Sequence, residues 1–366
     1  MAAGVKRAVA RVNLAAVQRN CVRLRDALTG GAELCAVVKA DGYGHGAAPC
    51  AEAALAGGAT WIAVAAASEA AHLRAVGIAA PLLVMGALTP AEVDVAAAAH
   101  ADVVTWDERF VAVLAGRRLR VHVKLDTGMG RLGTRDIDQA RRAVAAIEEA
   151  KGLELGGVMT HFATADEVGD AFLGEQLAAF APFAEEVKER HPSIVAHAAN
   201  SAATLREPRS HFDLVRCGVA IYGLDPFQRD HGDQGLEPAL TLRSYVAAVK
   251  PAAPGQSAGY GRRWTAGEPT HLATIPIGYG DGVRRALTNN ADVLIRGRRY
   301  PLAGTVSMDN ITVELGPDTY VRPYDEAVLI GDGVTAEEWA RRLDTINYEV
   351  TCGLTARVER EYHRDD

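Results

Sequence analysis

Cysteine is scarce in this sequence, and its spacing excludes the sites that need cysteines in pairs. The five cysteines are far apart and contain no CxxC motif: Cys21, Cys35, Cys50, Cys217 and Cys352. A disulfide framework or a cysteine-rich zinc site would show paired, regular spacing. We therefore expect buried or incidental thiols in a reducing compartment.

Long apolar runs and an excess of basic residues are also missing. No segment approaches the length needed to cross a bilayer, and residues 1–14 lack the apolar core of a signal peptide. The net charge is −7 and no basic cluster interrupts it, which argues against a general nucleic-acid binder. We expect a cytoplasmic protein without a membrane or nucleic-acid partner.

The first two-thirds of the chain alternates short apolar runs with amphipathic stretches. Ile137, Ala140, Val144 and Ile147 form an apolar helical stripe, and Thr89-Pro90-Ala91-Glu92 is a helix start signal. Eight strand–helix units in about 220 residues predict an α/β fold, a closed (β/α)₈ TIM-type barrel. On pattern alone, a doubly wound open sheet is the alternative. The eight candidate strands are Glu33–Lys39, Trp61–Ala66, Pro81–Gly86, Ala101–Thr105, Arg120–Leu125, Gly156–His161, Val195–Asn200 and Leu214–Tyr222.

A second, mostly β domain is predicted after the barrel. Proline, glycine and charge accumulate around Asp230–Pro238, so we place the domains at 1–234 and 235–366. A capping box at Thr335–Glu338 predicts one late helix, and the short strand Ala8–Val12 is a candidate to join this second domain. Its other strands are predicted at Thr241–Val249, His271–Ile277, Asp292–Arg296, Gly304–Ser307 and Ile311–Glu314.

Lys39 closes an apolar run and is followed by a segment rich in glycine. Burial lowers the pKa of a lysine amine, and the neutral amine can condense with an aldehyde. Lys124, His161, Asn200 and Arg216 also fall at or near predicted strand ends. Because barrel active sites are built on the face where the strands end, these five residues are expected to converge there. Taken singly, each is as well explained as an ordinary buried or surface polar residue.

Seven segments of the sequence, in their order and spacing, resemble the alanine racemases. These are barrel-type enzymes that use pyridoxal 5′-phosphate (PLP). The resemblance covers nearly the whole chain, although residues 353–360 lack the prolines expected there and leave the docking of the C-terminal tail open. The segments are Ala36–Gly46, Val123–Gly133, Thr160–Asp166, Leu214–Gly218, Ala258–Gly261, Ser307–Asp309 and Asn347–Glu349.

The resemblance implies a two-base racemisation of L- and D-alanine. Lys39, which also holds the cofactor, and Tyr260 would flank the substrate, since one proton must leave Cα and another must return from the opposite side. Arg216 would face the pyridine nitrogen of PLP. Because arginine keeps its proton, that nitrogen would stay unprotonated, which favours reprotonation at Cα over transamination.

The other roles implied by the resemblance concern the cofactor and the substrate carboxylate. Arg131 and the backbone N–H of Met308 would bind the carboxylate. Lys124 matches a lysine that is carbamylated in some members of the family, and its alternative is a plain lysine paired with Asp126. The remaining cofactor contacts would come from Tyr43, His161, Asn200, Ser201, Gly218, Val219 and Tyr348.

The family further implies a homodimer with shared active sites that supplies D-alanine for peptidoglycan, and no metal. A racemase of another small amino acid such as serine, and a PLP carrier without catalysis, are the alternatives. A carrier would resemble the first domain alone. A metal-dependent hydrolase built on Lys124, His122, His161 and His197 would need a histidine pair where Lys39 stands. PLP-dependent decarboxylases use an acidic partner for the pyridine nitrogen, and Arg216 argues against them.

Overall fold

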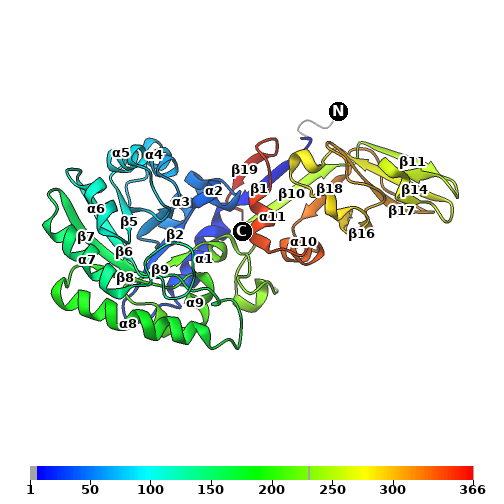
Figure 1. Cartoon of the computed structure of the whole chain (residues 1–366). Helices are drawn as coiled ribbons and strands as arrows, with labels where there is room; N and C mark the ends of the chain where they lie inside the picture. Colours follow the sequence, from blue (N-terminus) through cyan, green and yellow to red (C-terminus); the bar gives the residue numbers. More distant parts are fainter. Residues whose placement is uncertain (1–5, 230, 366) are drawn as a thin grey trace. The chain divides into compact units, whose positions relative to one another are not determined.

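The computed structural model describes residues 6–229 and 231–365 (Figure 1). The chain divides into two compact units. The barrel unit comprises residues 17–227 and 232–237, and the second unit comprises the described residues of 1–16, 228–231 and 238–366.

In the described residues of the barrel unit, eight parallel strands close on themselves. The last strand pairs with the first, with Arg216 opposite Cys35, so the sheet has no open edge. This confirms the predicted barrel and excludes the open sheet. The strands are β2 (Glu33–Val37), β3 (Trp61–Val64), β4 (Leu82–Val84), β5 (Ala101–Thr105), β6 (Leu119–Lys124), β7 (Leu153–Met159), β8 (Val195–His197) and β9 (Leu214–Cys217).

Helices follow the strands and cover the outside of the barrel (Figure 1). The capping box before α5 is present, because Glu92 N–H donates to Thr89 Oγ1 and Thr89 N–H donates to Glu92. The apolar stripe of α7 buries Ala140, Val144 and Ile147. The helices are α1 (Leu14–Arg25), α2 (Lys39–Tyr43), α3 (Ala47–Ala56), α4 (Ala67–Ala75), α5 (Pro90–Ala98), α6 (Glu108–Leu114), α7 (Ile137–Glu149), α8 (Phe172–Arg190) and α9 (Ser201–Arg206), with 3₁₀ turns η1 (Pro208–Ser210), η2 (Val219–Tyr222) and η3 (His231–Gln234).

The predicted strand Leu214–Tyr222 is too long. It ends at Cys217, because the Gly218 N–H donates to Ser201 Oγ (3.0 Å) instead of to a neighbouring strand. Residues 219–222 then form the 3₁₀ turn η2, with Ile221 N–H bonded to Gly218 O.

The second unit is mostly β, as predicted. Its described residues form a six-stranded sheet (order β16-β15-β18-β10-β1-β19), a three-stranded sheet (β11-β14-β17) and a two-stranded ribbon (β12-β13). The strands are β1 (Val9–Asn13), β10 (Leu240–Tyr245), β11 (Ala248–Ala252), β12 (Ser257–Ala258), β13 (Trp264–Thr265), β14 (Thr270–Ile275), β15 (Asp292–Ile295), β16 (Arg298–Pro301), β17 (Ile311–Gly316), β18 (Glu326–Ile330) and β19 (Glu359–His363). Two helices, α10 (Ala336–Leu343) and α11 (Asn347–Cys352), and the 3₁₀ turns η4 (Tyr260–Arg262), η5 (Tyr279–Asp281) and η6 (Arg285–Leu287) complete it.

Two predicted strands of the second unit are wrong in detail. The segment Thr241–Val249 is not one strand, because the chain leaves the sheet of β10 after Tyr245 and joins the sheet of β11 at Ala248. The segment Gly304–Ser307 is a loop. Gly304 has a left-handed φ of 93°, and its N–H donates to the Asn289 side chain rather than to a strand.

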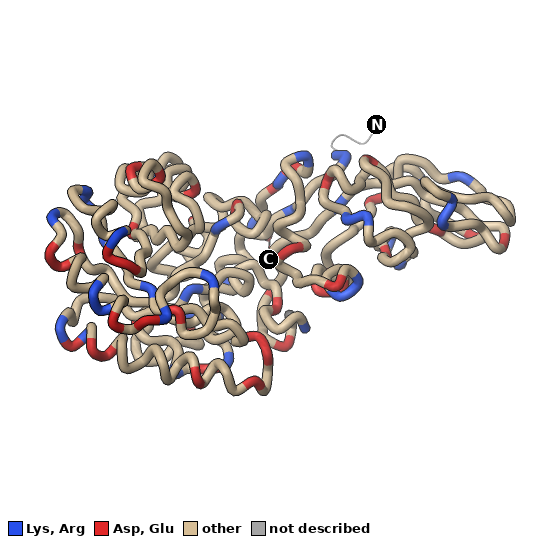
Figure 2. Tube along the Cα trace, viewed as in Figure 1, with Lys and Arg blue, Asp and Glu red and all other residues tan. Residues whose placement is uncertain are grey.

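The two ends of the chain meet in the six-stranded sheet. β1 pairs antiparallel with β10 and parallel with β19, so residues 359–363 form its edge strand. Acidic and basic residues are interspersed along both units (Figure 2). Among the described residues, no helix has the length and apolar character needed to cross a membrane.

Candidate active site

Lys39 begins α2 and is separated from the end of β2 by Val38 alone, so it lies at the end of the barrel where the strands terminate. The three residues after it, Ala40, Asp41 and Gly42, have left-handed backbone angles, with φ of 52°, 51° and 63°, and Tyr43 has a φ of 54°. A left-handed conformation costs about 1–2 kcal/mol for each residue that is not glycine. The turn therefore stores strain next to the lysine.

Side chains from two helices hold this strained turn. The Ala47 N–H, at the start of α3, donates to Asp41 Oδ1 (2.8 Å), and the Ala40 N–H donates to Glu69 of α4 (2.6 Å). The Lys39 amine lies 5.9 Å from the centre of the Tyr43 ring. The backbone directly after Lys39 is thus held by one contact with α4 and one with α3.

Arg216, in β9, lies buried in the interior of the barrel. Its Nη1 donates to His197 Nδ1 (2.8 Å), and its Nη2 donates to His161 Nδ1 (3.2 Å) and to the carbonyls of Thr160 and Ala198. His161, expected as a cofactor contact, is therefore bonded directly to Arg216. Burial and the cations Arg216 and Lys124 hold the pKa of His161 well below its ordinary value, so this imidazole is neutral.

One polar atom of Arg216 remains unused. Although Nε is buried, no described residue accepts a hydrogen bond from it. Buried donors normally have partners, so an unpaired one marks a place for a ligand acceptor. Burial lowers the pKa of Arg216 to about 10, and the guanidinium stays charged at neutral pH.

Lys124 is the last residue of β6 and is 4% exposed. Burial, followed by the cations Arg216 and Arg131, lowers the pKa of its amine to about 8. No ion pair between Lys124 and Asp126 is found among the described residues; Asp126 instead binds the N–H groups of Gly128 and Gly130. Lys124 is therefore a buried amine in a cluster of cations, and Arg131 itself is exposed on the following loop.

Three predicted cofactor residues meet beside β9. Ser201 Oγ accepts the N–H groups of Gly218 (3.0 Å) and Ala220 (3.4 Å). The Tyr43 ring lies against Gly218 so closely that a Cβ there would come within 2.8 Å of Tyr43 Cζ. The glycine is needed for this close approach.

The neighbouring predicted residues have structural contacts of their own. Asn200 caps α9, since its Oδ1 accepts the Ala203 N–H (3.0 Å). Val219 is buried at the start of η2. Both backbones therefore border the Ser201–Gly218 contact.

The other predicted residues lie in the second unit. Tyr260 begins η4 between two glycines of positive φ and is 74% exposed. Met308 lies in a loop and is 50% exposed. Tyr348 is half-buried in α11, next to Asn347, whose N–H donates to Gln228.

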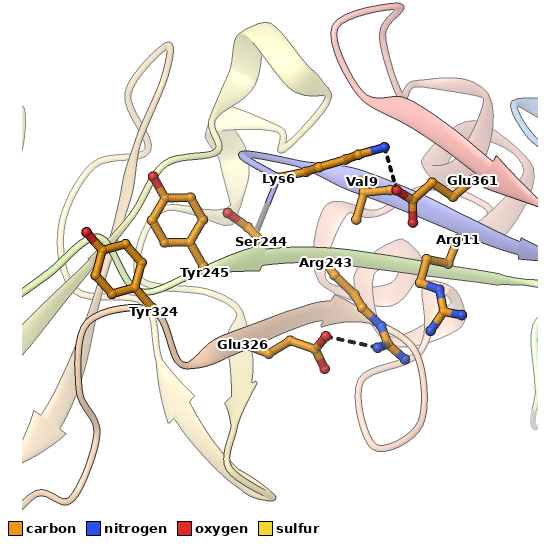
Figure 3. Close-up of a pocket in the computed structure, with 9 residues that line it drawn as sticks. All are labelled: Lys6, Val9, Arg11, Arg243, Ser244, Tyr245, Tyr324, Glu326 and Glu361. Atoms are coloured by element: carbon orange, nitrogen blue, oxygen red, sulfur yellow. Dashed lines mark hydrogen bonds and ion pairs between the residues drawn. The ribbon is translucent and has the colours of Figure 1, made fainter. Parts of the chain in front are cut away.

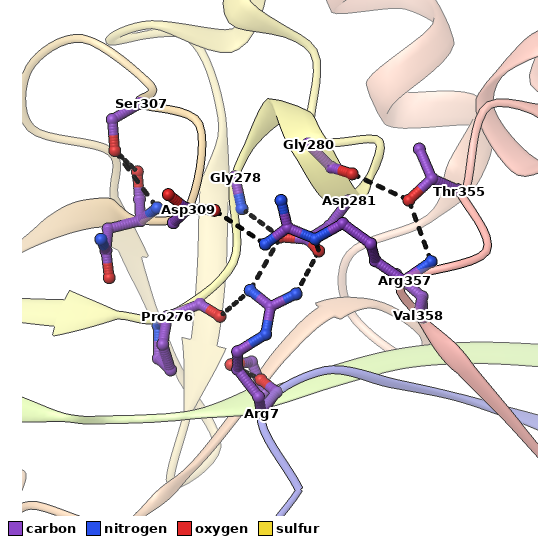
Figure 4. Close-up of polar contacts among 12 residues, drawn as sticks. Arg7, Pro276, Gly278, Gly280, Asp281, Ser307, Asp309, Thr355, Arg357 and Val358 are labelled. Carbon is purple, nitrogen blue, oxygen red and sulfur yellow. Dashed lines mark hydrogen bonds and ion pairs between the residues drawn. The ribbon is translucent and has the colours of Figure 1, made fainter.

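The loop of Met308 is held by a buried carboxylate, as Figure 4 shows. Asp281 is fully buried, and both Arg7 and Arg357 bind it. Arg357 also reaches Asp309, next to Met308 (2.7 Å), and the Gly280 N–H donates to Met308 O (2.9 Å). The loop geometry therefore depends on Asp281.

A cavity of about 300 Å³ in the second unit contains none of the predicted site residues (Figure 3). Its charges are paired, Lys6 with Glu361 and Arg243 with Glu326, and Tyr245 stacks on Tyr324. Arg243 Nε is buried without a partner among the described residues, but the guanidinium is already paired through Nη1 with Glu326 and no residue of the predicted site lies beside it.

The histidines considered for a metal site have other partners. His122 and His197 share a hydrogen bond of 2.8 Å, and their remaining nitrogens bind Asp102 and Arg216. With both ring nitrogens engaged, neither imidazole is free to bind a metal. In the described part of the chain, no group of three side chains has the arrangement of a metal site.

Comparison with known proteins identifies the family. Two family models match the chain, the N-terminal domain of alanine racemase over residues 12–226 and its C-terminal domain over residues 239–362. The chain belongs to the alanine racemase family. The resemblance of the seven segments is thereby confirmed.

Relatives in this family match over nearly their full length. The alanine racemase of Symbiobacterium thermophilum is 41% identical over 98% of both chains, and that of Mycobacterium tuberculosis is 42% identical over 97% of this chain and 96% of its own. The structure of alanine racemase from Streptomyces coelicolor A3(2) matches with a TM-score of 0.92 and 38% identity over 98% of each chain. That of the Bacillus anthracis enzyme with bound L-Ala-P matches with a TM-score of 0.91 and 35% identity, over 100% of this chain and 97% of its own.

The barrel brings most of the predicted racemase residues to the strand-terminal end of one unit: Lys39, Tyr43, Lys124, Arg131, His161, Asn200, Ser201, Arg216, Gly218 and Val219. Tyr260, Met308 and Tyr348 belong to the second unit. His197 was considered only as a metal ligand, and its hydrogen bond to Arg216 was missed. Side chains alternate along a strand, so His197 lies on the same side of β8 as Val195. This alternation is the sequence signal that could have indicated the direction of the histidine.

Replacing Asp281 by alanine is expected to lower the free energy of unfolding of the protein by about 3 kcal/mol, since Arg7 and Arg357 lose their shared buried carboxylate. Urea unfolding of the purified variant measures this. Asp309→Ala is the matched control: it loses only the exposed ion pair to Arg357, worth about 1 kcal/mol or less. Equal losses in the two variants would contradict the role assigned to Asp281.

Proposed function

We propose that this protein is a PLP-dependent alanine racemase that interconverts L- and D-alanine with Lys39 and Tyr260 as its two bases. The observation that carries the proposal is the unpaired buried Nε of Arg216, in a chain that both alanine racemase domain models match. Bound PLP supplies an aldehyde for the amino group and an electron-withdrawing ring that acidifies the Cα proton.

The barrel residues fit PLP at three points. Arg216 Nε offers a hydrogen bond to an aromatic nitrogen, and the Lys39 amine, 5.9 Å from the centre of the Tyr43 ring, would bond to the aldehyde. The Ser201 hydroxyl and the close contact of Tyr43 with Gly218 suit a phosphate. Because arginine does not release its proton, it leaves the pyridine nitrogen unprotonated. This favours return of a proton to Cα over transamination.

Lys39 and Tyr260 have the chemistry that racemisation requires. Lys39 Nζ would take or return the proton on one side of Cα and Tyr260 Oη on the other. The phenol needs a lowered pKa for this task, so cations such as Arg131 are expected near it in the complete site. Arg131 and the Met308 N–H would hold the substrate carboxylate, and Tyr348 would narrow the entrance beside the phosphate.

The PLP-loaded protein is expected to exchange the Cα proton of L-alanine in D₂O and to produce D-alanine. NMR of the Cα proton and a chiral assay follow the two events together. Lys39→Ala and Tyr260→Phe should each abolish racemisation, while Tyr320→Phe, an exposed tyrosine elsewhere, should not. Exchange without formation of D-alanine would contradict the two-base mechanism and indicate an enzyme with one base. No exchange with PLP bound would support the alternative of a PLP carrier without catalysis. Measuring racemisation of serine beside that of alanine tests the substrate preference, since a small apolar pocket rejects an added hydroxyl only weakly.

We further propose a homodimer in which each active site takes Tyr260 from the partner subunit. The exposure of Tyr260 and Met308 supports a second surface that covers them. Mixing the inactive Lys39→Ala and Tyr260→Phe proteins should restore roughly a quarter of the wild-type rate, because re-assorted dimers hold one intact site each. No recovery after subunit exchange, checked by sedimentation, would contradict the shared site.

The buried Lys124 amine is proposed to be carbamylated. Its pKa of about 8 leaves a substantial neutral fraction near pH 7.5. The neutral nitrogen bonds to the carbon of CO₂ and releases a proton, and the resulting anion would face Arg131 and Arg216 favourably. We expect a carbamate signal in ¹³C NMR with labelled bicarbonate, present in wild type and absent in Lys124→Ala. The signal should weaken as the pH falls below about 8, because the competing amine becomes protonated. A signal that survives in Lys124→Ala would contradict the assignment.

A cytoplasmic location and a supply of D-alanine for peptidoglycan are proposed with the activity. The described structure contains no disulfide, and four of its five cysteines are buried, which suits a reducing compartment. Cell fractionation tests the location, and growth of a D-alanine-requiring bacterium that expresses the chain tests the supply.

A further inference from the structure

A chain of three buried hydrogen bonds runs from Arg216 into the barrel interior. Arg216 Nη1 lies 2.8 Å from His197 Nδ1, His197 Nε2 lies 2.8 Å from His122 Nδ1, and His122 Nε2 lies 3.0 Å from Asp102 Oδ2. Four different strands, β9, β8, β6 and β5, supply the four residues. Both imidazoles are fully buried, and Asp102 is 7% exposed.

Arg216 and Asp102, at the two ends of this series of hydrogen bonds, fix the position of every proton in it. Arginine can only donate, and an ionised carboxylate can only accept. Three contacts therefore need three protons, one each from Arg216, His197 and His122. A doubly protonated His122 would donate to His197 and force the His197 proton against the Arg216 donor. Both histidines must therefore be neutral and carry their proton on Nε2.

Two glycines in the neighbouring strand leave space for the His122 ring, although glycine destabilises a strand. Two consecutive glycines, Gly156 and Gly157, lie in β7 opposite this part of β6. A Cβ on Gly156 would come 2.9 Å from His122 Nε2, and one on Gly157 would come 2.4 Å from the Val195 carbonyl oxygen and 2.5 Å from His122 Nδ1. Glycine in a strand interior is unfavourable by roughly 0.5–1 kcal/mol, and at Gly156 the closest contact that explains it is the imidazole of His122.

Asp102 supplies the negative charge of the chain. The other groups bonded to Arg216 are the neutral His161 and two carbonyls. Asp102 also lies 3.5 Å from Arg120 Nη1, which is partly exposed. A buried cation is expensive without compensation, and the imidazoles connect Arg216 to the only carboxylate found along these hydrogen bonds in the described residues.

We propose that Asp102 and His122 are positioning residues for Arg216, fixing the tautomers of both imidazoles so that the guanidinium is held with its Nε toward the cofactor site. The inference rests on the proposed function in one respect, the role of Arg216 Nε toward the pyridine nitrogen. With Asp102 replaced by asparagine, the side chain at this position can donate a hydrogen bond as well as accept one. The direction of donation along all the hydrogen bonds can then reverse. His197 Nδ1 would then carry a proton facing Arg216, and the arginine would lose its orientation.

Histidine ring NMR on the cofactor-free wild-type protein tests the proton arrangement. Long-range ¹H–¹⁵N spectra distinguish the two tautomers and the doubly protonated ring, and His122→Gln and His197→Gln assign the signals. Both residues are expected to be neutral with the proton on Nε2. Either ring protonated on Nδ1 would overturn the proposal. This result does not depend on racemase activity, so it stands or falls separately from the proposed function.

Asp102→Asn tests the positioning role, and Arg120→Gln is its control because it removes the outer partner of the same carboxylate, together with the contacts of Arg120 with Glu154 and Trp61, and leaves the hydrogen-bond chain intact. In Asp102→Asn we expect Nδ1–H signals to appear and, in the PLP-loaded enzyme, the number of racemisation turnovers per pyruvate formed by transamination to fall about 10-fold. In transamination the amino group moves to PLP while Cα is oxidised to the ketone. An unchanged ratio, or an equal fall in Arg120→Gln, would overturn the role. If Asp102→Asn does not fold, the wild-type spectra still decide the proton arrangement.

Discussion

The cation of Arg216, buried near the strand-terminal end of the barrel, is the constraint around which the rest of the site is arranged. Its Nη atoms are engaged by two neutral imidazoles and two carbonyls, and one donor remains. Burial of their own side chains, followed by the charge of Arg216, lowers the pKa of Lys124 and holds the pKa of His161 well below its ordinary value. Desolvation and the neighbouring cation thus act in the same direction on both groups.

The two units divide the requirements of a racemase between them. The barrel unit holds buried polar groups with few degrees of freedom, whereas Tyr260 and Met308 of the second unit are exposed on loops. The Met308 loop is nevertheless ordered by a buried carboxylate with two arginines. Membership of the alanine racemase family explains why both units occur in one chain.

The barrel could be predicted from sequence because it produces local signals, and the candidate site residues in it were located by their strand ends and by the resemblance to the family. β-branched runs mark the strands, and the residues at strand ends are placed on one face by the topology. The partners of Arg216 could not be fully predicted, since His122 and Asp102 meet it only through register between non-adjacent strands. The loop at Gly304 and the break at Tyr245 were missed for a related reason: long-range partners, Asn289 and the sheet of β14, decide the backbone there.

The left-handed turn after Lys39 has a consequence for motion during the proposed reaction. Three consecutive left-handed residues, tethered by Asp41 and Glu69, constrain the backbone that follows Lys39. In the proposed reaction the amine would both hold the cofactor and reach Cα. The amine would move by rotation about the bonds of its four side-chain methylenes, and such rotations occur on roughly the picosecond-to-nanosecond scale. The anchor thereby separates a stationary main chain from a rapidly reorienting base, and the movement of the lysine itself would not limit turnover.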